Sequence, residues 1–100
     1  MGLPAARFGD VDVFHCSLPI RIGGSSNVLI NGRFAQRQGD LNAPHLLPAS
    51  CPVCCVVHAA PVAVGSLTVR INGRGAARMT DTIAGCTSVA TGSLNVRIGA

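Results

Sequence analysis

Four side chains that can bind a metal stand out because an internal repeat places three of them. Each of the three lies five residues after an aspartate: His15 after Asp10, His45 after Asp40 and Cys86 after Asp81. His58 is the only other histidine in the chain. Tetrahedral zinc takes four nitrogen or sulfur ligands, with the imidazoles neutral and the cysteine as thiolate. A fold that gathers these positions would therefore hold one Zn²⁺ per chain, and a shell filled by protein ligands is structural rather than catalytic.

The common register comes from a unit that recurs along the chain. Residues 24–33 read Gly-Ser-Ser-Asn-Val-Leu-Ile-Asn-Gly-Arg, residues 65–74 read Gly-Ser-Leu-Thr-Val-Arg-Ile-Asn-Gly-Arg, and residues 92–99 repeat the first part of the unit. The three linkers 4–15, 33–45 and 74–86 share an Arg-x-x-Asp step that precedes the metal-capable residue. The sequence therefore predicts a pseudo-threefold fold in which the ends of the three linkers meet.

The elements that must position these linkers are short strands. Apolar residues alternate along each unit, as in Val28 and Ile30, which is typical of a half-buried strand. A second apolar run precedes each unit, and a Gly-Ser turn lies between the two, so we predict β-hairpins at about 20–31, 61–72 and 88–99. An Asn-Gly pair is expected to end the first two hairpins, because both residues accept positive φ. The predicted class is mainly β, with no substantial helix, as a single domain over 1–100 that carries a Cys-rich insertion at about 46–60.

Composition limits the classes of function. The chain is 48% hydrophobic but 3% aromatic, so its core must consist of small aliphatic side chains and would be thin. The formal charge is +4, but the repeat places the arginines where they serve the fold, through pairs such as Arg37 with Asp40. No aromatic platform or known nucleic-acid motif accompanies them, which disfavours nucleic-acid binding. The N-terminus has no signal-peptide pattern, and the most apolar stretch, 51–64, is shorter than the roughly 20 residues that span a bilayer. We therefore expect a chain that starts in the cytoplasm and does not insert stably into a membrane.

Two alternatives remain open for the metal-capable residues. Cys51, Cys54, Cys55 and His58 have the local spacing of a zinc site of their own, which would take His58 from the symmetric set. Each histidine could also be an isolated turn residue, and the cysteines, with Cys16, could be small apolar side chains. A small zinc- or thiol-dependent enzyme or redox protein built on Cys51–Cys55 is the alternative function. The chain has no glutamate, no HExxH and no GxSxG pattern, so we expect no enzyme.

The linkers also carry a resemblance to a known family. Pro4-Ala5-Ala6-Arg7 is the motif for which the PAAR-repeat family is named, and later copies read Phe34-Ala35-Gln36-Arg37 and Gly75-Ala76-Ala77-Arg78. With the Gly-Ser hairpins, the chain resembles a PAAR protein over almost its whole length. The later copies lack the proline, so the backbone path rather than its stiffness would be shared.

The resemblance implies a small cone that caps the trimeric VgrG spike of a bacterial type VI secretion system and sharpens it for piercing a target envelope. It implies a zinc near the point, matching His15, His45, His58 and Cys86, and a base docked on the trimer at one copy per trimer. The candidate base or core positions are Val28, Ile30, Val69, Ile71, Val96 and Ile98. It further implies export on the spike after cytoplasmic assembly, with separate effector proteins as additional partners. The equivalent tip of a contractile phage tail is the other reading of the same resemblance.

Overall fold

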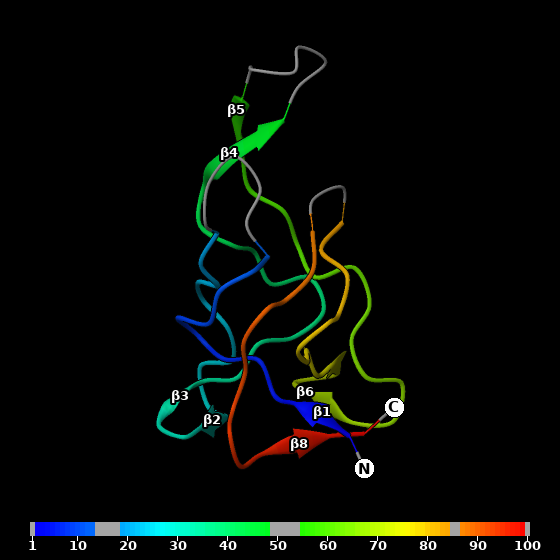
Figure 1. Cartoon of the computed structure of the whole chain (residues 1–100). Coiled ribbons are helices and arrows are strands. Elements are labelled where there is room, and N and C mark those ends of the chain that lie inside the picture. Colours follow the sequence, from blue (N-terminus) through cyan, green and yellow to red (C-terminus); the bar gives the residue numbers. More distant parts are fainter. Residues whose placement is uncertain (1, 14–18, 49–54, 85–86, 100) are drawn as a thin grey trace.

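A computed structural model of the chain describes residues 2–13, 19–48, 55–84 and 87–99, with 45–48 and 55–58 described by their backbone. The described residues contain short strands and turns and no helix. The molecule is elongated, 39 × 24 × 23 Å, with several short hairpins at its broad end and one longer ladder at the other end (Figure 1). The strands are β1 (Leu3–Pro4), β2 (Leu29–Ile30), β3 (Arg33–Phe34), β4 (His45–Pro48), β5 (Cys55–His58), β6 (Arg70–Ile71), β7 (Arg74–Gly75) and β8 (Arg97–Ile98). The prediction of a small, mainly β fold is confirmed.

Three antiparallel pairs form the broad end, which we call the base: β2 with β3, β6 with β7, and β1 with β8. Asn31 and Gly32 connect the first pair, with φ of 54° and 77°, and Asn72 and Gly73 connect the second, with φ of 54° and 80°. Positive φ at both central residues is the requirement of the type I′ turn, which matches the twist of the strands that it joins. The third pair joins the two ends of the chain, so the described termini lie together at the base.

The predicted hairpins at 20–31, 61–72 and 88–99 are wrong in their pairing. Leu29–Ile30 pairs forward with Arg33–Phe34 across the Asn-Gly turn, rather than backward with the run at 20–22. That earlier run instead bridges other parts of the chain, through Ile20 with Val11 and Arg21 with Asn42. The Asn-Gly pair is the turn of the hairpin and does not end it, because a two-residue I′ loop closes a hairpin more readily than the longer Gly-Ser bend does.

The pseudo-threefold arrangement is visible as closed rings of hydrogen bonds. The backbone amide of Gln36 donates to the backbone carbonyl of Ala6 at 3.1 Å. In the same way the backbone amide of Ala77 donates to Gln36 at 2.9 Å, and that of Ala6 donates to Ala77 at 3.0 Å. A second ring of backbone hydrogen bonds closes in the opposite direction around the axis: Phe8 donates to Phe34, Gln38 to Gly75, and Met79 to Pro4, each at 2.8 Å. Because each repeat bonds to the next and the third returns to the first, the three linkers form one collar around a common axis.

The core lies along this axis and is made of small aliphatic side chains, as predicted. The cluster at the base contains Ala5, Ile30, Ala35, Ile71, Ala76 and Ile98, all buried. A second cluster farther from the base contains Ala6, Ala60, Val62, Ala77, Ile83 and Val89. The Gly-Ser bends pack closely against this core, since a Cβ added to Gly24 would lie 2.7 Å from the carbonyl oxygen of Ala35 and one added to Gly92 would lie 2.8 Å from that of Ala5. The glycine of the repeat is therefore a steric requirement.

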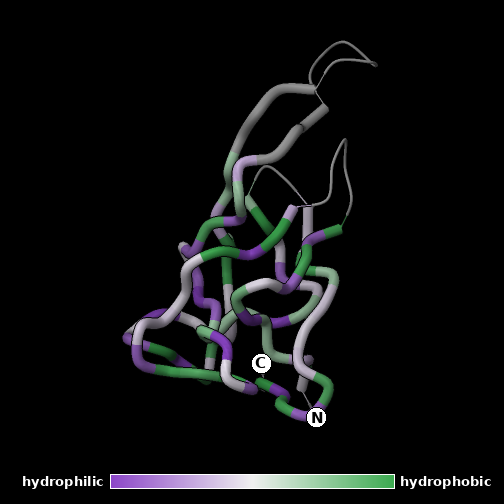
Figure 2. Tube along the Cα trace, turned by 90° about the vertical axis from the view of Figure 1, so that its left-hand side faces the viewer, coloured by the Kyte–Doolittle hydropathy of each residue, from purple (hydrophilic) through white to green (hydrophobic). Residues whose placement is uncertain are grey.

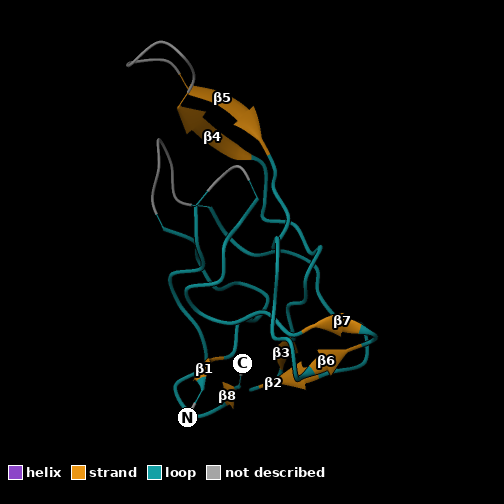
Figure 3. Ribbon diagram, turned by 90° about the vertical axis from the view of Figure 1, so that its right-hand side faces the viewer, coloured by secondary structure: helices purple, strands orange, loops and turns teal. Residues whose placement is uncertain are grey.

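The insertion contributes the ladder of β4 and β5 at the end opposite the base (Figure 3). Its register pairs His45 with His58 and Pro48 with Cys55. Figure 2 shows the base and the ladder at opposite ends of the molecule from another side. Polar and apolar residues are mixed along the linkers between them.

Candidate functional site

Two of the four predicted zinc ligands are direct partners in one ladder. His45 begins β4, His58 ends β5, and the two are opposed in the antiparallel register. Directly opposed residues share a face of the ladder, with Cβ atoms about 4.5–5.5 Å apart. That spacing suits two ligands of one tetrahedral ion, and an imidazole pair completed by a third nitrogen and a thiolate is a donor set that zinc accepts. The backbone at His45 and His58 therefore fits the predicted site.

The other two predicted ligands, His15 and Cys86, lie outside the described residues. The described segments that flank them run to the same end of the molecule as the β4–β5 ladder (Figure 1). Asp12, Asn42 and Ile83, each three residues before a metal-capable position, occupy equivalent bridges, to Val89, Arg21 and Val62. The three linkers thus approach the end of the molecule opposite the base, which we call the narrow end, with equivalent residues forming equivalent bridges.

The Arg-x-x-Asp step of each linker forms a closed loop. In the second linker, Oδ2 of Asp40 accepts hydrogen bonds from the backbone amide of Arg37 at 2.8 Å and from its Nε at 2.9 Å, and Oδ1 accepts from its NH2 at 3.0 Å. The hydrogen bond to Asp40 raises the pKa of Arg37 above its ordinary value, so the guanidinium stays charged. Arg7 with Asp10 and Arg78 with Asp81 repeat these contacts. These three loops, which we call the Arg-Asp latches, confirm the predicted pairing and hold each linker rigid ahead of the metal-capable residue.

Each latch also connects its linker to the base, two of them at an Asn-Gly turn and the third just after β8. NH1 of Arg7 donates to Oδ1 of Asn31 at 3.0 Å, and NH1 of Arg37 donates to Oδ1 of Asn72 at 3.1 Å. In the third repeat, NH1 of Arg78 donates to the carbonyl of Gly99 at 2.9 Å. Since each bond passes from one repeat to another, the latches tie the collar to the base.

A buried polar group that sequence reasoning missed lies on the same level as the second core cluster, since it bridges Val89 of that cluster. Arg21 and Asp12 form an ion pair with both side chains fully buried, Nε to Oδ1 at 3.4 Å. Nδ2 of Asn42 donates to Oδ2 of Asp12 at 3.0 Å, and Oδ1 of Asn42 accepts from the amide of Ala60 at 2.8 Å. The signal was available in the repeat, because Arg21 stands where the other two units have Val62 and Val89.

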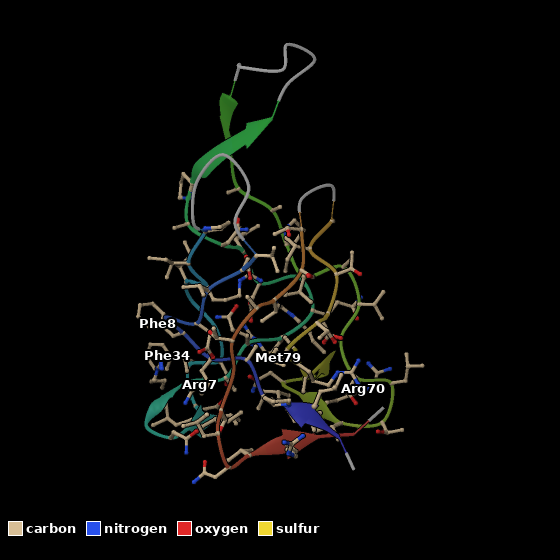
Figure 4. All side chains as sticks on the ribbon, viewed as in Figure 1. Arg7, Phe8, Phe34, Arg70 and Met79 are labelled. Carbon is tan, nitrogen blue, oxygen red and sulfur yellow. The ribbon has the colours of Figure 1, made fainter. Side chains whose placement is uncertain are left out.

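The candidate partner-binding positions divide between the core and the surface. Ile30, Ile71 and Ile98 are buried, whereas Val28 and Val96 are partly exposed and Val69 is exposed. Among the large hydrophobic side chains that the structure describes, the most exposed are Leu67 and Leu94, 77% and 99% exposed, at equivalent places in two Gly-Ser bends. An exposed aromatic pair marks one seam of the collar, where Phe8 and Phe34 meet edge to face at 6.1 Å between ring centroids (Figure 4).

The alternative zinc site falls largely outside the described part of the chain. Cys16, Cys51 and Cys54 lie outside the described residues, and Cys55 is placed only by its backbone, opposite Pro48. Among the side chains that the structure does describe, no three of His, Cys, Asp or Glu gather as a further metal site.

The described residues also include no helix that is long and apolar enough to cross a membrane. No protein-family model matches the chain, and no curated protein matches it.

Proposed function

We propose that this chain is the zinc-bearing tip of a bacterial contractile injection spike, seated on the blunt end of a trimeric VgrG-type β-helix of a type VI secretion system. The observation that carries the proposal is the closed hydrogen-bonded collar of three linkers. A pseudo-threefold chain can sit on the axis of a true trimer and meet each subunit with an equivalent element. The resemblance to PAAR proteins in the linkers supports the same assignment.

The metal would be held at the narrow end by His15, His45, His58 and Cys86. When bound, zinc would supply a cross-link between the three linkers and the β4–β5 ladder, without turnover. The register of His45 with His58 supports two of these ligands, and the Arg-Asp latches fix the linkers that lead to the others. A small domain with a thin core gains much of its folding free energy from such a site.

The proposed work of the chain is mechanical, because its parts lie in series along one axis. Load at the narrow end would pass through the linkers to the collar, where it is shared by two rings of backbone hydrogen bonds. The latches then connect the collar to the base, through two Asn-Gly turns and through Gly99 after β8. Fraying is opposed at each level, because the bonds join separate repeats rather than neighbours in sequence.

Co-expression with a VgrG-type trimer tests the proposal. The expected result is a complex that survives size exclusion and contains one chain per trimer, with the chain on the threefold axis in electron micrographs. Three chains per trimer, or no complex with any spike trimer, would contradict it. A complex with a phage-tail spike in place of VgrG would show that the chain is the tip of a contractile phage tail. Assembly in the bacterial cytoplasm, export on the spike and carriage of separate effectors are parts of this proposal.

A further inference from the structure

The acidic side chains of this protein are all withdrawn from its surface. The sequence contains four acidic residues, all of them aspartates, and each is buried. Each is also paired with an arginine: Asp10 with Arg7, Asp12 with Arg21, Asp40 with Arg37, and Asp81 with Arg78. No acidic side chain is therefore exposed to bind a cationic partner or to repel an anionic one.

The four other arginines leave the formal net charge of +4, and all of them lie on the base strands. They are Arg33 on β3, Arg70 on β6, Arg74 on β7 and Arg97 on β8. Two of them also reach the buried aspartates, with NH2 of Arg33 at 3.9 Å from Oδ1 of Asp10 and NH1 of Arg74 at 3.4 Å from Oδ1 of Asp40. The side chains of Arg33 and Arg74 are 39% and 50% exposed, and Arg70 and Arg97 are exposed as well. Figure 4 shows Arg70 at the base end of the molecule. The charge of the protein is thus concentrated at one end.

Arg70 and Arg97 are held in place yet keep donors free for a partner. NH1 of Arg70 donates to the carbonyl of Gly73 at 3.2 Å, and NH1 of Arg97 donates to that of Gly2 at 3.1 Å, so each guanidinium is anchored by the glycine that precedes the paired strand. A guanidinium has five N–H donors in a planar fork, so one such bond leaves a fork available for a carboxylate. The ordering cost of binding is reduced because the side chains are already positioned.

Exposed leucines accompany the arginines. Leu67 and Leu94 lie in two Gly-Ser bends. Leu29, which is 55% exposed, occupies the position on β2 that Arg70 occupies on β6 and Arg97 occupies on β8. Apolar anchors with arginines beside them have the composition of a protein–protein interface, in which arginine is enriched. Nucleic acid or an anionic membrane would be attracted by the charge, but neither calls for leucines at pseudo-threefold positions.

We propose that the base recognises a ring of aspartate or glutamate carboxylates on the end of the partner trimer, which surrounds apolar pockets for Leu67 and Leu94. This inference rests on the proposed function and specifies the chemistry of the docking surface. Arginine and carboxylate pair bidentately, and such complementarity speeds encounter and fixes orientation.

The test is the affinity of the full, zinc-loaded chain for a purified VgrG-type trimer as a function of salt. The expected dissociation constant rises roughly tenfold or more between about 0.1 M and about 0.5 M NaCl, because exposed charges are screened. Arg70→Gln with Arg97→Gln should weaken binding and flatten this dependence, whereas the matched Arg70→Lys with Arg97→Lys should keep most of it. Leu67→Ser with Leu94→Ser should weaken binding at every salt concentration.

The outcomes separate the two proposals. A complex whose affinity ignores both salt and the glutamine variants would overturn the carboxylate ring while leaving the spike tip intact. The absence of a complex at any salt would overturn the proposed function itself. Salt-sensitive binding to a DNA duplex or to phosphatidylserine vesicles, without binding to the trimer, would overturn the inference in favour of those anions. Unchanged zinc content and circular dichroism confirm that each variant is folded.

Discussion

Nε of Arg21 lies 3.4 Å from Oδ1 of Asp12 in a setting where neither side chain is exposed to solvent. The other two repeats fill the position of Arg21 with valine, so the ion pair breaks the threefold pattern of the core. Because a buried charge needs its counterion beside it, only one arrangement of the three repeats satisfies this pair. We infer that it specifies which repeat occupies which place in the collar.

Removal of one member of this pair should destabilise the protein strongly. Arg21→Met leaves the Asp12 carboxylate buried without its counterion, and Asp12→Asn does the same to the guanidinium, so each should lower the free energy of unfolding by about 3–5 kcal/mol. The double variant should lose clearly less than the sum of the two. Urea denaturation of all four proteins at fixed zinc concentration measures the coupling. Simply additive losses would show that the two charges do not depend on each other.

The Arg-Asp latches should contribute to stability more than any exposed charge does. Asp40→Ala removes the acceptor of the Arg37 backbone amide as well as the ion pair, so a loss of about 1–3 kcal/mol is expected. The matched control is Arg70→Ala, an exposed substitution that should change the free energy of unfolding by no more than about 0.5 kcal/mol. Equal effects of the two substitutions would remove the structural role assigned to the latches.

The Asn-Gly turns should be sensitive to backbone conformation alone. A Cβ added at Gly32 would meet no atom within 4 Å, but the φ there is +77°. Gly32→Ala should therefore cost about 1 kcal/mol through strain rather than through a clash. Gly32→Asn should cost less, because asparagine tolerates this conformation. Chemical denaturation of the two variants, compared at the same position, checks the difference; alanine as stable as asparagine would refute the type I′ assignment.

Metal content should depend on the symmetric positions and not on the cysteines of the insertion. His45→Ala and Cys86→Ala should each reduce bound zinc well below one equivalent and lower the melting temperature, because each removes a quarter of a closed shell. Cys51→Ala is the matched control and should retain one equivalent. Elemental analysis of the purified proteins after dialysis measures the ratio. If Cys51→Ala and Cys54→Ala lost the metal instead, the local site of the insertion would be the true one.

Much of the arrangement could be predicted from the repeat, because matched residues in a closed ring take matched places. The fold class, the small-aliphatic core and the pairing of Arg37 with Asp40 followed from periodicity and spacing. The pairing of the strands did not, since apolar alternation identifies strands without stating which turn joins them. The ends of the chain also pair with each other through β1 and β8, a contact that local pattern cannot reveal.

The polar part of the core was hidden for a different reason. Arg21 lies within an apolar run and is flanked by Ile20 and Ile22. Burial of arginine depends on a partner that comes from elsewhere in the chain, here Asp12, and the sequence does not show that meeting. The direct opposition of His45 and His58 likewise depends on the register of the β4–β5 ladder, which the alternation of apolar residues does not specify.

The central claim is that three linkers and one ladder meet around a single ion, and the anomalous signal of zinc tests it most directly. Crystals of the purified chain, measured on both sides of the zinc absorption edge, should give one peak at the narrow end, bounded by His15, His45, His58 and Cys86. A peak on Cys51, Cys54 and Cys55, or crystals of zinc-purified protein without any peak, would contradict the account.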